Sequence, residues 1–191
     1  IVTLNKSIMK KVISLFSLFL LLSACSKEEI QPTDDNELIT TVKLQFTSVT
    51  NPASPVKTFY WRDIQGDGIV DSIDPIMLDK NATYQMTIEL LDETKKPVFD
   101  ITKEVQEEGD EHLFVYKSNP IGLLGVSIKD LDKKGLPIGL QAEVKTQYAP
   151  GDGKFAILLK HQPPVNGKLV KDGTEAPGST DVDIEFLVTL K

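Results

Sequence analysis

The sequence predicts an all-β fold, an antiparallel β-sandwich of the immunoglobulin-like kind. Apolar and polar residues alternate with a period of two over most of the chain after residue 38. This pattern is typical of strands with one buried and one solvated face. Clusters of glycine, proline and aspartate separate the alternating runs. Only residues 101–108 have a pattern that suits a helical turn, so the crossover helices of an α/β binding protein are not predicted.

The predicted strands follow this alternation along the chain, as in Val42, Leu44 and Phe46. Seven or eight strands within about 150 residues fit a sandwich, and a small β-barrel is the alternative arrangement. The expected strands cover residues 42–47, 57–62, 84–90, 113–116, 124–129, 140–145, 155–160 and 181–190. The expected turns lie at residues 132–135, 150–153 and 177–178.

The first residues have the parts of a secretion signal in order. Lys10 and Lys11 form a positive segment, and an uncharged, largely apolar run covers residues 12–22. A membrane-spanning helix needs about 20 apolar residues, so this run is too short to cross a bilayer. We therefore predict a cleaved signal peptide over residues 1–24.

The run ends in Leu22-Ser23-Ala24-Cys25, which resembles the lipobox of bacterial lipoproteins. The resemblance implies a diacylglycerol on the Cys25 thiol, cleavage before Cys25 and acylation of the new amine. Two or more acyl chains hold a protein firmly in a membrane. Cys25 is the only cysteine of the chain, so no disulfide is expected within the exported domain.

The residues after Cys25 resemble sorting signals of Gram-negative lipoproteins. Ser26 is similar to the residue that routes lipoproteins to the outer membrane, and Lys27–Glu29, a lysine followed by two acids, is similar to a surface-export signal. We expect a lipid-anchored protein of the outer membrane that faces the cell surface, with a periplasm-facing position as the alternative. Residues 25–38 are the expected lipidated cysteine and flexible tether, and residues 39–191 the expected single domain.

Charge and motifs restrict the function of this domain. Removal of residues 1–24, which hold three lysines and no acids, moves the net charge from −7 to −10. Nucleic acid is therefore not an expected partner, because Lys and Arg supply that attraction. The chain has no GxSxG, HExxH or phosphate-binding glycine loop and no cysteine outside the lipobox, so we do not predict an enzyme.

An acidic loop has the spacing of a calcium site. The segment 63–74 reads DIQGDGIVDSID and resembles the DGDG-type loops of thrombospondin type 3 repeats and dockerins. Calcium takes six to eight hard oxygen ligands, which alternate residues of a tight loop can supply. The candidate ligands are Asp63, Gln65, Asp67, Asp71 and Asp74. The alternative is a glycine- and aspartate-rich turn with solvated carboxylates.

The two histidines form a second candidate metal site. His112 follows an acidic stretch at the entry to the predicted strand 113–116, and His161 lies at the end of the predicted strand 155–160. Imidazoles with acids nearby are ligands for zinc or copper. Two strand-end histidines with local hydrogen bonds are the alternative.

Three functions follow from these observations. The whole domain resembles small outer-membrane lipoproteins of Gram-negative bacteria over Phe59–Gly68 and Asp110–Tyr116. This resemblance implies an accessory or binding module beside an outer-membrane uptake receptor or a glycan, with or without calcium. A zinc- or copper-handling lipoprotein that uses His112 and His161 is the second hypothesis, and a structural envelope protein is the third. Trp61, the only tryptophan, is expected in the core, with a role in binding as the alternative.

Overall fold

The structure is a computed structural model that describes residues 38–191. These residues belong to one compact unit, Asn36–Lys191. The predictions for the signal peptide, for the lipobox residues Leu22, Ser23 and Ala24, and for Cys25 lie outside the described residues. They therefore stay predictions.

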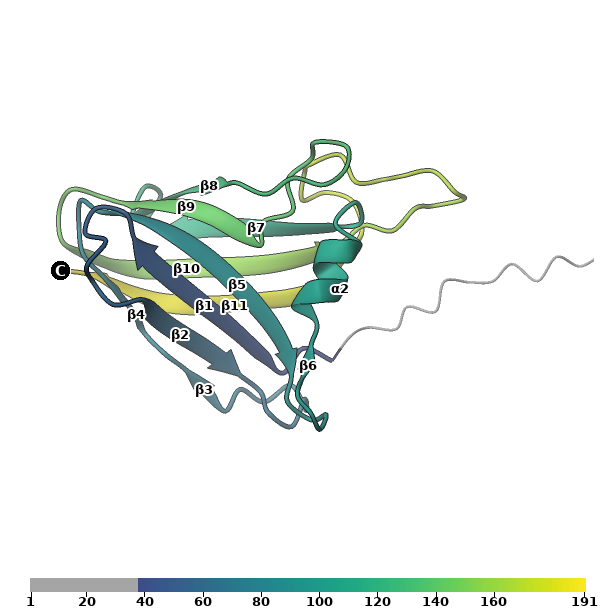
Figure 1. The fold of residues 1–191 in the computed structure, drawn as a ribbon, viewed down its shortest axis with the longest axis horizontal. Helices are drawn as coiled ribbons and strands as arrows, with labels where there is room; N and C mark the ends of the chain where they lie inside the picture. Colours follow the sequence, from purple (N-terminus) through teal and green to yellow (C-terminus); the bar gives the residue numbers. More distant parts are fainter. Residues whose placement is uncertain (1–37) are drawn as a thin grey trace, which may run out of the picture. The chain divides into compact units, whose positions relative to one another are not determined.

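Seven antiparallel strands form the larger sheet (Figure 1). Its order is β3-β2-β1-β5-β9-β8, and the short strand β6 pairs with the end of β5. The strands of this sheet are β1 (Thr41–Ser48), β2 (Lys57–Arg62), β3 (Ser72–Ile73), β5 (Thr83–Asp92), β6 (Phe99–Asp100), β8 (Leu124–Ile128) and β9 (Gln141–Thr146).

Four strands form the smaller sheet, in the order β4-β11-β10-β7. They are β4 (Ile76–Leu78), β7 (His112–Asn119), β10 (Gly151–His161) and β11 (Ser179–Leu190), and β4 runs parallel to β11. The short helix α2 (Thr102–Glu107) leads from β6 towards β7 at one end of the sheets (Figure 1). Among the described residues, no helix combines the length and the apolar character needed to span a bilayer.

The core lies between the two sheets and contains the apolar half of each alternating strand. Val42, Leu44 and Phe46 of β1 are fully buried, and Phe155 and Ile157 of β10 are buried as well. Removal of such side chains from water contributes about 25 cal/mol for each Å² of apolar surface. The period of two in the sequence therefore records which face of each strand joins the core.

The all-β sandwich is confirmed, and each of the eight predicted strands is present. The immunoglobulin-like topology is not confirmed. The strands that the sequence did not predict, β3, β4 and β6, have only two or three residues, too few for an alternating pattern to be visible.

The predicted turn at 150–153 is wrong for Gly151–Gly153, which are the first residues of β10. They pair with residues 188–190 of β11. A Cβ at Gly153 would overlap the Asn119 carbonyl oxygen of the neighbouring strand. Glycine is present here because two backbones approach closely, and not because the chain turns.

A loop of residues 162–178 joins β10 to β11 and is fastened at two points. The Lys171 ammonium donates hydrogen bonds to the Gly109 carbonyl (2.7 Å) and to the Asp132 carboxylate (3.0 Å), and both charged side chains are 1% exposed. At the end of the loop, Gly178 has φ +78° and lies against the His161 carbonyl. Only glycine has both the left-handed conformation and the small size that this contact needs.

We expect Gly178→Ala to destabilise the domain by more than about 2 kcal/mol, because its Cβ would overlap backbone atoms that cannot move aside. Gly173→Ala is the matched control. Gly173 also has a positive φ, of +84°, but its added Cβ would meet its nearest neighbour at 3.5 Å. This variant should lose only the roughly 1–2 kcal/mol of left-handed strain. The measurement is the free energy of unfolding in urea. If the two variants lose equal amounts of it, Gly178 is not required by its contact with the His161 carbonyl.

Candidate metal centre

The two histidines lie side by side at the end of the smaller sheet. His112 is the first residue of β7 and His161 the last of β10, and the antiparallel register places them directly opposite each other. Their rings are stacked, with centroids 4.8 Å apart and planes inclined by 7°. By alternation with Phe114 and Leu159, both side chains point to the core face of the sheet. The structure therefore brings the two predicted histidines together.

A carboxylate from the third strand completes this cluster. Val182 of β11 lies opposite Leu159, but Thr180 lies opposite Lys160, so the register shifts at Asp181. Strict alternation would direct Asp181 away from the face of Val182, and a β-bulge redirects a side chain in this way. One ligand atom from each of His112, His161 and Asp181 lies within 4.8 Å of the other two. Among residues 38–191, this is the one group of three or more histidine, cysteine or acidic side chains as close as this.

His112 has the protonation state of a metal ligand. Its Nδ1 lies 3.2 Å from the Glu108 carbonyl oxygen, which can only accept a hydrogen bond. Nδ1 therefore carries the hydrogen, and the lone pair is on Nε2. Burial lowers the pKa of His112 from 6.5 to about 4, with contributions from the charges of His161 and Lys171. The ring is therefore neutral at pH 7, as metal binding requires.

Glu111 and Lys171 form the charged surroundings of the cluster. The Glu111 carboxylate oxygen lies 3.7 Å from Nε2 of His161, and both side chains are about one quarter exposed. Burial and the neighbouring charges of Glu108 and Asp110 raise the pKa of Glu111. Lys171 is held by the ion pair with Asp132. Glu111 thus adds one more carboxylate near the cluster, beside the partly exposed His161.

An ion bound here would draw the side chains closer together. Two ligand atoms of a tetrahedral zinc ion are roughly 3.3 Å apart, because each lies about 2.0–2.1 Å from the metal. The three ligand atoms here are within 4.8 Å. An imidazole lone pair lies in the plane of its ring, so the two stacked rings must tilt to direct both lone pairs at one ion.

The acidic loop at 63–74 uses its carboxylates for its own backbone. Asp63, which is 5% exposed, accepts hydrogen bonds from the N–H groups of Gly66, Asp67 and Gly68. The other three carboxylates each accept one backbone N–H within the loop or from β2, with Asp67 bonded to Ile69, Asp71 to Ile64 and Asp74 to Tyr60. The Gln65 amide faces Asp71. These bonds shape the turn, and the calcium site stays a prediction.

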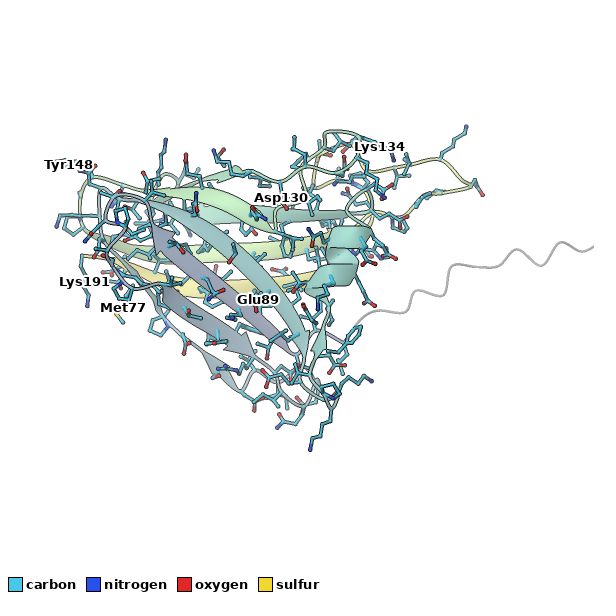
Figure 2. The ribbon with its side chains drawn as sticks, viewed as in Figure 1. Met77, Glu89, Asp130, Lys134, Tyr148 and Lys191 are labelled. Carbon is cyan, nitrogen blue, oxygen red and sulfur yellow. The ribbon has the colours of Figure 1, made fainter. Side chains whose placement is uncertain are left out.

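A cleft of about 330 Å³ lies beside α2, apart from the two histidines. Its walls include Gln106, Asp130, Ile138 and Gln141. Figure 2 shows Asp130 beside β9, where its carboxylate accepts hydrogen bonds from the N–H groups of Gly139, Leu140 and Gln141. Asp130 therefore shapes the wall of this cleft.

Trp61 packs against the hydrophobic core as a partly buried side chain. It lies opposite Ile73 of β3 in the antiparallel register. This position agrees with the expected core role of the only tryptophan.

Comparison of the chain with protein-family models, with curated proteins and with solved structures gave no match. The resemblance to small outer-membrane lipoproteins therefore stays a prediction. Metal binding is therefore inferred from the positions of His112, His161 and Asp181 alone.

Asp181 is the member of the cluster that sequence reasoning missed. In the sequence it is one of three acidic residues on the polar face of the last strand, with Asp183 and Glu185. Only the register shift against β10 distinguishes it. A bulge has no signature in a single alternating strand, so no signal in the sequence marked this residue.

We expect the metal-free domain to lose stability as the pH falls from 6.5 to about 4, because the unfolded chain protonates His112 in this range and the folded chain does not. The difference between the two pKa values corresponds to a loss on the order of 3 kcal/mol. The measurement is urea unfolding in EDTA as a function of pH. His112→Asn keeps a donor for the Glu108 carbonyl but does not titrate, so its stability should fall less. If the unsubstituted domain and His112→Asn show the same dependence of stability on pH, the loss of stability is not caused by His112.

The calcium prediction has its own test. If the 63–74 loop binds calcium only in the folded state, millimolar calcium should raise the melting temperature above that in EDTA. Asp67→Ala should abolish the rise, whereas Asp183→Ala, on β11, should keep it. An unchanged melting temperature of the unsubstituted protein would show that the loop is only a turn.

Proposed function

We propose that this chain is a lipid-anchored envelope protein whose sandwich binds a divalent transition metal ion, with zinc or copper as the expected ions. The observation that supports the metal site is the convergence of His112, His161 and Asp181 from three adjacent strands. The anchor is the expected lipid on Cys25. The site therefore belongs to a domain that stays beside a membrane.

The donor set selects the class of ion. Two imidazoles and one carboxylate suit zinc, copper, iron or nickel, whereas calcium and magnesium prefer oxygen ligands. A zinc site with three protein ligands keeps a fourth position for water or another ligand. Glu111 lies close enough to His161 to accept a hydrogen bond from water in that position, or to occupy the position itself.

Several features of the fold support metal binding at this position. The ligands come from strand ends, where His161 retains 23% of its side-chain exposure, so an ion can enter from solvent. The Glu108 carbonyl orients His112, which is the usual arrangement of a ligand histidine. Because the strands are held by the core, the ligands are close together before the ion arrives, which lowers the entropic cost of binding.

Zinc should raise the melting temperature of residues 26–191 relative to EDTA. An ion bound only by the folded state, at 100 times its dissociation constant, adds about 2.7 kcal/mol. For a chain of this size this corresponds to roughly 5–10 °C. His161→Ala and Asp181→Asn should each remove most of the shift, because each takes away one ligand.

Asp183→Asn is the matched control for Asp181→Asn. It removes the same charge from the same strand, two residues away on the exposed face, so it should keep the zinc-dependent shift. If Asp181→Asn keeps the full shift, or if Asp183→Asn loses it equally, zinc does not bind at the cluster. Titration calorimetry with zinc and with copper then ranks the two ions.

A further inference from the structure

Exposed apolar side chains gather at the end of the larger sheet where β1 begins. Each retains between 40% and 71% of its exposure. They are Leu38, Ile64, Ile69, Val70, Ile73 and Phe99, and we call them the end patch. Single exposed apolar residues are ordinary, but a group at one end of a domain needs an explanation.

The strand registers show that these residues lie at one end of the sheet. A single row of paired residues runs across five strands, from Asp100 of β6 through Leu91, Thr41 and Arg62 to Ser72 of β3. At about 4.8 Å between strands, this row is roughly 19 Å wide. Phe99 and Ile73 are next to its two ends, and Figure 1 shows β3 and β6 at the same end of the sandwich.

The turn after β2 adds the central part of the end patch. The Asp71 N–H donates to the Arg62 carbonyl at 2.8 Å, which closes the turn that contains Ile64, Ile69 and Val70. Leu38 lies against Gly66 of the same turn. The first described residue of the domain is therefore part of the end patch.

The charged side chains of Arg62 and of the turn after β2 are engaged within the protein. Asp63, Asp67 and Asp71 accept hydrogen bonds from the backbone of the turn. Arg62 lies 3.6 Å from Glu93. The acids give no attraction for anionic lipid, so the end patch suits a zwitterionic surface that accepts apolar side chains.

We propose that the end patch rests on the membrane that holds the lipid anchor, with Ile69 and Val70 inserted at its interface. This inference rests on the anchor of the proposed function and not on the metal site. Leu38 is only thirteen positions after Cys25. Such a segment reaches at most about 45 Å, even when it is fully extended. The lipid therefore keeps the end patch close to the bilayer, where even a weak contact is populated because of the high effective concentration.

Trp61 is a built-in probe of this contact, since it is the only tryptophan and lies opposite Ile73. The full lipidated chain is reconstituted into phosphatidylethanolamine–phosphatidylcholine vesicles with and without brominated acyl chains. We expect brominated lipid to quench Trp61 emission. Ile69→Glu should abolish most of this quenching of Trp61. The variant should still float with the vesicles, because flotation reports the anchor alone.

Ile121→Glu is the matched control. Ile121 is 99% exposed in the turn between β7 and β8. By register this turn lies near the C-terminal end of β11, on the side of the sandwich where Figure 2 places Tyr148 and Lys191. This variant should keep the quenching. Vesicle-bound protein whose Trp61 is not quenched overturns the proposal but leaves the anchor intact. If Ile69→Glu changes only the oligomeric state in sedimentation, the end patch is a protein interface and the proposal is wrong.

Discussion

The pairing of β10 with both β7 and β11 is the constraint on which the candidate site depends. Pairing with β7 places His112 opposite His161, and in the pairing with β11 the register shifts at Asp181. The same strand is buried on its core face through Phe155, Ile157 and Leu159. Packing of the core therefore fixes the register, and the register fixes the distances between the three ligands.

The surroundings of the cluster follow from the same strand ends. The chain leaves β10 immediately after His161 and returns to β11 at Gly178, against the His161 carbonyl. Between these points, the buried ion pair of Lys171 with Asp132 fastens the loop. Breaking such a pair leaves one charge buried without its counter-charge. The loop is thus held tightly near the ligands, whereas His161 itself remains accessible to water.

Much of the fold could be predicted from the sequence, because alternation directly reports which face of a strand is buried. Strands such as β5 and β11, with ten and twelve residues, contain several repeats of the pattern. Strands of two or three residues contain none, and the glycines of residues 151–153 have the composition of a turn although their role is close packing. The histidines were recognisable as candidate ligands by residue type, but their proximity depends on a pairing between distant segments. Asp181 was not recognisable, since a bulge is a property of two strands together.

The central claim is that the three strand-end side chains share one ion, and the zinc-edge X-ray absorption spectrum tests it most directly. Protein loaded with one equivalent of zinc should show two imidazole nitrogens and carboxylate oxygen at about 2.0–2.2 Å from the metal. The spectrum of Asp181→Asn should keep the imidazole scattering and change the oxygen shell. A spectrum with only oxygen ligands, or one with a single imidazole, would contradict the account, because the register of β7 and β10 would then not bring the two histidines to one metal.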